Sequence, residues 1–196
     1  MVRTWPKSQS SFSVIDRPAP PASVLANDRR AGYQGESTMI ADVKQFTLFQ
    51  GLTQREVDAV ARLCERATCK KGDCLFSVGE RALFLYLLRS GGVELRMTAK
   101  SYNADVEIPL DIKSEGETFG WSAIASPYKY TLSAYATDDC DLWQINQADI
   151  EKLCEENSHL GYVFMKNTVR TIGQRYQLAR EMLIKELQHT EEQRKW

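Results

Sequence analysis

The sequence predicts a mainly β domain, a sandwich or jelly roll, flanked by helices. Three observations predict it: a helix-start signature near residue 53, a central stretch of short alternating segments between turns, and a helical apolar pattern after residue 157. A chain of 196 residues is expected to hold one domain. Its composition, 43% hydrophobic and 26% charged, is ordinary for a soluble globular protein.

Residues 1–38 differ in character from the remainder of the chain. They are rich in proline and serine and show little apolar periodicity, which predicts a disordered N-terminal leader. Met39 follows directly, where structured-looking sequence begins. We hypothesise that translation of the native protein starts there, which the intact mass would test.

The charge and hydropathy exclude several classes of partner. A net charge of -1 argues against a general nucleic-acid or membrane-surface binder. No apolar run is long enough to span a bilayer, and the N-terminus lacks the apolar core of a signal peptide. We therefore expect a cytoplasmic protein without contact to a membrane.

The first helix is predicted from its start signal. Thr53 with Glu56 three residues later forms a capping box. One face of the helix is expected to carry Val57, Val60, Ala61 and Cys64. We expect this helix to end before Lys70.

Residues 66–145 change to a period of two, typical of strands. The run 84–88 is continuously apolar, which predicts a strand buried on both faces. Alternating apolar positions, typical of half-buried strands, are Val93, Leu95 and Met97, then Val106, Ile108, Leu110 and Ile112. Pro109 is expected on an edge strand or at a bulge, because proline cannot donate to a ladder.

Helices return after the last strand. Asn146 is expected to cap a short helix that runs to about Glu156, and Asn157 or Ser158 a long one. The long helix carries a heptad seam of Tyr162, Met165, Val169, Ile172, Tyr176, Ala179 and Leu183. One face of this helix can meet its own barrel and another a second chain, and we favour dimerisation.

The stretch 116–131 is the strongest candidate for a binding site. Gly116 and Gly120 bracket Phe119, and small residues follow. If the turn opens a short helix, its N–H groups can bind an anion. The alternative is a tight inter-strand turn with a buried aromatic side chain.

Several motifs together resemble the cyclic nucleotide-binding domain of the cyclic-AMP receptor protein superfamily. They are Leu48-Phe49-x-Gly51-Leu52, Lys71-Gly72, Leu75-Phe76, Gly79-Glu80, Leu85-Tyr86-Leu87-Leu88, Gly92-Val93-Glu94-Leu95 and Gly116-Glu117-x-Phe119-Gly120 with Ala123. The resemblance implies an eight-stranded antiparallel jelly-roll barrel with its N-terminal helix over 39–157, and a long C-terminal helix over 158–196. In the superfamily's transcription factors a helix-turn-helix domain follows that helix; here the chain ends at Trp196, so we expect no DNA binding of that type.

The resemblance also implies a binding chemistry. In that family the cassette holds a cyclic phosphate with N–H groups and one arginine, and a glutamate takes the ribose hydroxyl. Here Trp121 stands at the glutamate position and Tyr128 at the arginine position, with Lys129 adjacent. Lysine can meet a phosphate only as a point charge, and tryptophan cannot accept a hydroxyl proton.

Two functions follow as alternatives. The first is a regulatory domain that senses cyclic AMP, cyclic GMP or another small anionic ligand and signals through the C-terminal helix, as a homodimer or with a partner protein. The second is an interaction module whose pocket holds no ligand. The candidate ligand-binding residues are Glu117, Phe119, Gly120, Trp121, Ser122, Ala123, Tyr128, Lys129, Tyr130 and Thr131.

An enzyme is not expected. His159 and His189 both follow the strands, which excludes a histidine-bound metal in the barrel, and no nucleophile or phosphate-loop motif is present. The cysteines are Cys64, Cys69, Cys74, Cys140 and Cys154, and we expect reduced thiols in small buried side chains rather than ligands of an iron–sulfur cluster. We therefore expect no catalytic and no metal-binding residues.

Overall fold

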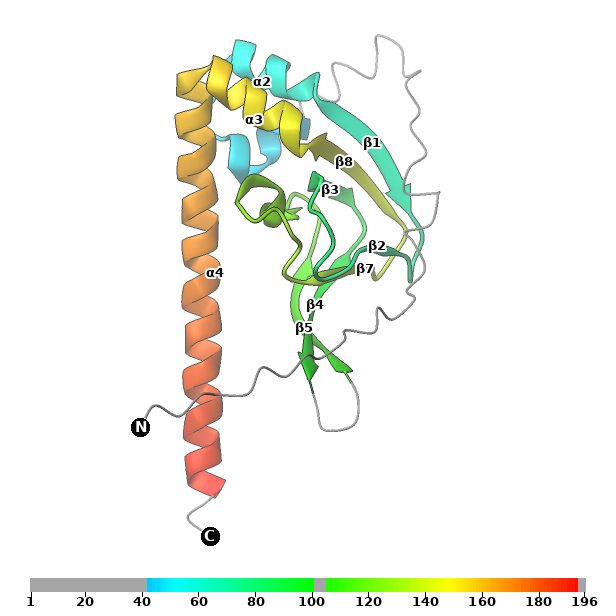
Figure 1. Ribbon diagram of the computed structural model, residues 1–196, viewed down its shortest axis with the longest axis vertical. Helices are drawn as coiled ribbons and strands as arrows, with labels where there is room; N and C mark the ends of the chain where they lie inside the picture. The colour runs from blue at the N-terminus through cyan, green and yellow to red at the C-terminus, as the bar shows by residue number, and fades with distance from the viewer. Residues whose placement is uncertain (1–41, 101–104, 194–196) are drawn as a thin grey trace, which may run out of the picture.

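The computed structural model describes residues 42–100 and 105–193. The predicted leader, 1–38, lies outside the described residues. Eight strands form two antiparallel sheets, with helices at one end and a long helix along one side (Figure 1). The mainly β class and the strand number are confirmed, but no hydrogen-bonded strand pair among the described residues closes the two sheets into a barrel.

The first sheet has the strand order β1-β8-β3-β6 and the second β2-β7-β4-β5. The strands of the first are β1 (Cys64–Cys69), β8 (Cys140–Asn146), β3 (Phe84–Ser90) and β6 (Thr118–Phe119). The strands of the second are β2 (Cys74–Phe76), β7 (Ser133–Ala136), β4 (Val93–Lys100) and β5 (Asp105–Lys113). The main core lies between the sheets, with contributions from every strand except β5.

Strand β3 is buried on both faces, as its continuous apolar run predicts. Tyr86 and Leu88 point into the core between the sheets. Leu85 and Leu87 point the other way, into a second core formed with the helices. The central position of β3 follows from this double burial, because a strand with apolar side chains on both faces must be covered on both.

Strand β5 is an edge strand, which suits Pro109. The β4–β5 register shifts where Leu95 and Arg96 face Asp111 and Pro109, so the proline also lies at an irregularity. The alternating apolar side chains of β5 remain 40–61% exposed. Because β5 lies at an edge, the described part of the chain covers these side chains only in part.

The helical end begins with η2 (Thr47–Phe49) and α2 (Gln54–Ala61). The capping box is confirmed: the Thr53 N–H donates to the Glu56 carboxylate at 2.8 Å. The helix ends at Ala61, before Lys70 as expected. The expectation that Cys64 lies on its apolar face is wrong, because Cys64 begins β1 and pairs with Ile145 of β8. Here sheet pairing overrides the helical spacing.

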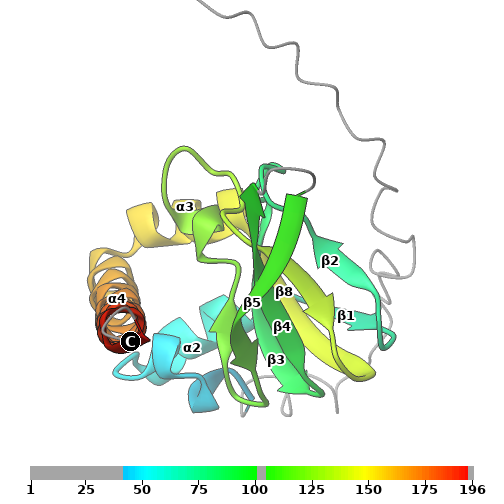
Figure 2. The same ribbon diagram turned by 90° about the horizontal axis from the view of Figure 1, so that it is seen from below.

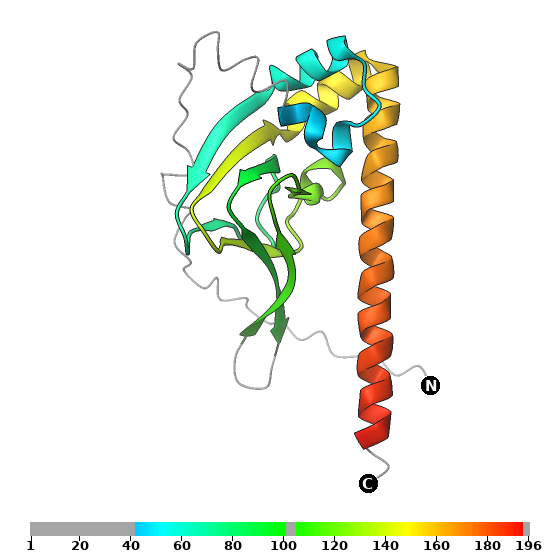
Figure 3. The same cartoon turned by 180° about the vertical axis from the view of Figure 1, so that it is seen from behind.

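Two helices complete the fold, α3 (Gln147–Glu156) and α4 (Ser158–Gln193). Asn146 caps α3 by accepting from the Ala148 N–H, and Asn157 accepts from the Leu160 N–H at the start of α4, so both predicted caps are confirmed. Figure 2 shows α4 nearly end-on, at the side of the molecule where α2 and α3 lie. From behind, the lower part of α4 extends past the strands (Figure 3).

Asn167 fixes α4 against the helical end. Its side chain is 4% exposed and donates two hydrogen bonds, to the Leu48 carbonyl at 3.0 Å and to the Gln50 carbonyl at 2.8 Å. Phe164, one turn earlier, stacks on Phe49 with ring centroids 6.0 Å apart. These contacts hold the first part of α4, whereas the part beyond it passes the mouth of a cavity.

Candidate functional site

The glycine-rich stretch forms a tight connection anchored on β3. The Gly116 N–H donates to the Leu88 carbonyl and the Leu88 N–H to the Glu117 carbonyl, both at 2.9 Å. Gly120 has φ 83°, a left-handed conformation that side chains disfavour. A four-residue 3-10 helix, η3 (Trp121–Ile124), follows, which is too short to form a strong N-terminal dipole.

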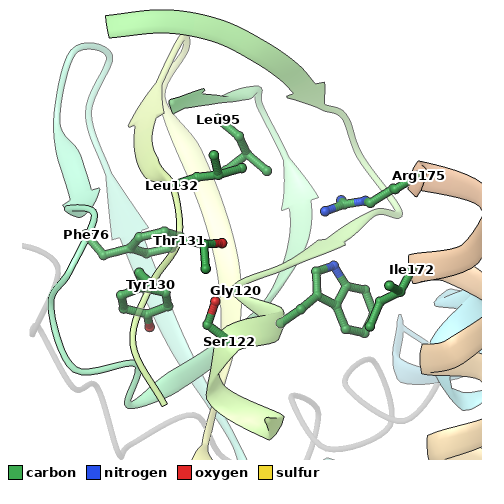
Figure 4. A pocket seen from close by; sticks show the side chains of 10 residues that line it. Phe76, Leu95, Gly120, Ser122, Tyr130, Thr131, Leu132, Ile172 and Arg175 are labelled. Atoms are coloured by element: carbon green, nitrogen blue, oxygen red, sulfur yellow. The ribbon is translucent and has the colours of Figure 1, made fainter. Parts of the chain in front are cut away.

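A cavity of about 190 Å³ opens beside this connection. Figure 4 shows the side chains that line it, which come from β2, β4, the stretch 120–132 and α4. They are Phe76, Leu95, Gly120, Trp121, Ser122, Tyr130, Thr131, Leu132, Ile172 and Arg175. The lining is mainly apolar with a few polar groups, as in sites for small organic ligands.

Half of the predicted ligand-binding residues line the cavity. These are Gly120, Trp121, Ser122, Tyr130 and Thr131. Tyr130 stacks on Phe76 with ring centroids 3.7 Å apart, and its hydroxyl donates to the Phe84 carbonyl at 2.9 Å. Burial raises the pKa of Tyr130 to about 12, so its hydroxyl stays protonated.

The other predicted residues point elsewhere. Phe119 and Ala123 are fully buried in the core between the sheets, so they shape the wall rather than face a ligand. The Tyr128 hydroxyl donates to the Glu151 carboxylate on α3 at 2.7 Å. The Lys129 side chain is exposed, and its backbone pairs with that of Arg81 in an isolated antiparallel β-bridge. Lys129 does not belong to the cavity lining. The Glu117 carboxylate accepts from Lys113 at 2.8 Å.

Arg175 is the cavity residue that the sequence analysis missed. It belongs to α4, and its side chain is 28% exposed. Its guanidinium lies 6.0 Å from the centroid of the Trp121 ring and 3.5 Å from the Asp111 carboxylate. Burial lowers the pKa of Arg175, an effect that Asp111 and Glu117 oppose. In the sequence, its position one turn after Ile172 on the long helix is the signal that could have placed Arg175 at the cavity.

A small charge cluster surrounds Arg175. Lys113, whose side chain is 7% exposed, pairs with Asp111 at 2.9 Å and with Glu117 at 2.8 Å. Asp111 therefore has two cationic partners, Lys113 and Arg175. The cluster joins β5, the glycine-rich connection and α4 at the mouth of the cavity.

One polar atom of the cavity lacks a partner. The Trp121 Nε1 is buried and has no hydrogen-bond acceptor among the described residues. A buried donor without an acceptor costs free energy, about 1–3 kcal/mol. An acceptor on a ligand can satisfy this donor once the side chains that cover it move aside.

Other chemistries find little support in the described part of the chain. It holds no group of three or more His, Cys, Asp or Glu side chains that could bind a metal ion. Its five cysteines are free, and burial raises the pKa of Cys64 and of Cys69 to about 12, which disfavours the nucleophilic thiolate. No described helix combines the length and apolarity needed to cross a bilayer.

Comparison with known proteins gives consistent matches. Residues 66–157 match the family described as the cyclic nucleotide-binding domain. A structure of a candidate cyclic nucleotide-binding protein from Geobacter metallireducens is 30% identical, with a TM-score of 0.58 over 69% of this chain and 96% of that one. This neighbour matches over nearly its whole length.

Two curated relatives are longer. The cyclic AMP receptor protein of Thermus thermophilus is 30% identical over 107 residues, 55% of this chain and 48% of the relative. The cAMP-dependent protein kinase regulatory subunit of Yarrowia lipolytica is 23% identical over 138 residues, 70% of this chain and 34% of the relative. The chain thus spans between a third and a half of the curated relatives that it matches.

Proposed function

Because the chain belongs to the cyclic nucleotide-binding domain family, we propose that it is a regulatory domain that senses a cyclic nucleotide or a related small anionic ligand. We propose further that it signals through α4 and acts in the cytoplasm without catalysis of its own. The observation that carries this proposal is the composition of the cavity wall, which is shared between the stretch 120–132 and α4. A ligand there contacts the sensor and the signalling element at once.

The size of the cavity supports coupling between binding and helix position. Its volume of about 190 Å³ is below the roughly 300–1,000 Å³ of typical ligand pockets. Ile172 and Arg175 are the two lining residues from α4. We propose that a nucleotide displaces α4 outward on binding, which changes the helix surface presented to a partner.

The outer face of α4 offers an interface for that output. Tyr162, Val169 and Tyr176 are 64–70% exposed, and Met165, Ile172 and Leu183 are 46–61% exposed. Apolar side chains at heptad spacing are typical of helix pairing. We propose that this face pairs with a second copy of the chain or with a partner protein, and Ile172 belongs to both the cavity and this face.

The alternative, an interaction module without a ligand, is favoured by the cavity's small volume and by its lack of a carboxylate for a ribose hydroxyl. In that case the apolar face of α4 alone carries the function. Glu117, a carboxylate within the glycine-rich stretch, is paired with Lys113 and does not line the cavity.

Thermal unfolding of the purified chain with cyclic AMP, cyclic GMP and non-cyclic nucleotides distinguishes the two. A ligand at 100 times its dissociation constant stabilises by about 2.7 kcal/mol, which raises the Tm by roughly 5–10 °C in a chain of this size. Stabilisation by a nucleotide supports the sensor. No shift with any of them at millimolar concentration, together with loss of pairing in Tyr176→Glu, supports the alternative.

A further inference from the structure

The Arg175 guanidinium has more N–H donors than partners among the described residues, and it lies where burial makes a charge unfavourable. The guanidinium is planar, and its fan of N–H groups can bind an anionic group with two parallel hydrogen bonds. Within the described residues its one ion pair is with Asp111, through Nη2, at a long 3.5 Å. Burial of a cation whose side chain is only 28% exposed is unfavourable with so few partners, unless a second anion binds the remaining N–H groups.

Asp111 can release Arg175 at little cost. Its carboxylate also pairs with Lys113 at 2.9 Å, which is closer than its pair with Arg175. Lys113 in turn keeps Glu117 at 2.8 Å. When Arg175 turns to a ligand, no buried charge is left alone, so the exchange of anions is easy.

The remaining polar groups of the cavity fit the same kind of ligand. The Trp121 Nε1 is a buried donor without an acceptor, and its ring lies beside the Arg175 guanidinium. Ser122 and Thr131 add hydroxyls, and no carboxylate belongs to the lining. The lining therefore suits an acceptor-rich anion that also carries a flat ring, and it contains nothing that would select a ribose 2′-hydroxyl.

We propose that Arg175 binds the anionic group of the ligand in exchange for Asp111, while the Trp121 Nε1 donates to a ligand acceptor. This inference rests on the proposed function and specifies its ligand class: an anion with a flat ring, whose recognition is indifferent to the 2′-hydroxyl. It transfers the cationic role from Lys129 in the glycine-rich stretch to a residue on α4. The anion then holds α4 directly.

The geometry disfavours Lys129 for this role. Lys129 is exposed and lies outside the lining, and its backbone bridges to Arg81. Arg175 enters the cavity from α4, next to Ile172 (Figure 4). The two cations are therefore a matched pair for substitution, one inside the site and one outside it.

Calorimetric titration of the full chain with cyclic AMP and with 2′-deoxy cyclic AMP tests the proposal. We expect Arg175→Gln to weaken binding of both about tenfold or more, because a charge-assisted bond is lost. Asp111→Asn, which removes the competing carboxylate, is expected to tighten binding by several-fold. Lys129→Gln and the omission of the 2′-hydroxyl are each expected to change affinity by less than about twofold.

The outcomes separate this inference from the proposed function. If the wild-type chain binds but Lys129→Gln weakens binding while Arg175→Gln and Asp111→Asn do not alter it, the sensor function stands and the role of Arg175 is refuted. If the 2′-deoxy compound binds at least about tenfold more weakly, the proposed ligand class is refuted. If the wild-type chain binds neither compound, nor any nucleotide in the thermal screen, both proposals are refuted. Arg175→Lys, which keeps the charge, provides a second variant if Arg175→Gln does not fold.

Discussion

Asn167 gives the most direct test of how α4 is held. The substitution Asn167→Ala removes hydrogen bonds to the carbonyls of Leu48 and Gln50 at a site that is 4% exposed. Each net hydrogen bond contributes about 1 kcal/mol, and carbonyls left buried without a donor add to the loss. We therefore expect a destabilisation of about 2–4 kcal/mol, which corresponds to a Tm lower by roughly 5–15 °C.

Urea unfolding followed by circular dichroism measures this loss. Arg170→Ala, nearly one turn further along α4 on an exposed side chain, is the matched control and is expected to stay within about 0.5 kcal/mol of the wild type. Asn167→Asp keeps the shape but removes the donor, so it is expected to be at least as harmful as alanine. If Asn167→Ala unfolds within about 0.5 kcal/mol of the wild type, the anchoring role is refuted.

Three further predictions concern the fold around the site. Gly120→Ala places a Cβ 2.9 Å from the Phe84 carbonyl oxygen at φ 83°, so we expect a clearly lower Tm, by a free energy of about 2 kcal/mol or more; an unchanged Tm would contradict this. Leu142→Ala empties a fully buried position between the sheets and is expected to cost about 2–5 kcal/mol in urea unfolding, whereas Ile112→Ala, at a side chain 61% exposed, should cost almost nothing. Burial raises the pKa of Glu56, but hydrogen bonds from Thr53 and His159 outweigh it and lower that pKa to about 2 from its ordinary value of 4.5. The stability that ionised Glu56 supplies is therefore complete above pH 4.5 and is lost as the pH falls toward 2. We expect the free energy of unfolding of Glu56→Gln to fall less steeply between pH 4.5 and pH 2 than that of the wild type. An identical pH dependence in the variant would refute the assignment.

Local signals in the sequence were sufficient for much of the fold. The capping box at Thr53, the caps at Asn146 and Asn157 and the double burial of β3 each follow from side-chain chemistry within a few residues. The change from helix to strand before Cys64 could not be predicted in this way. It depends on pairing of β1 with β8, whose residues lie more than 70 positions away along the chain.

The candidate site was only half predictable for a related reason. Turn residues near Gly120 identified the connection, but not which side chains face inward. Tyr128 and Lys129 follow the motif closely, yet one contacts Glu151 and the other faces solvent. Arg175 joins the site from 55 positions after Gly120, because α4 folds back along the sheets.

The anchor at Asn167 makes α4 a lever. At a rise of about 1.5 Å per residue, Arg175 lies about 12 Å beyond the anchor, and Gln193, where α4 ends, about 39 Å beyond it. If the helix pivots at Asn167 as a rigid rod, an outward movement of about 1 Å at the cavity becomes about 3 Å at Gln193. Under the proposed function, a small displacement of α4 that admits a ligand is amplified mechanically at the far end of the helix.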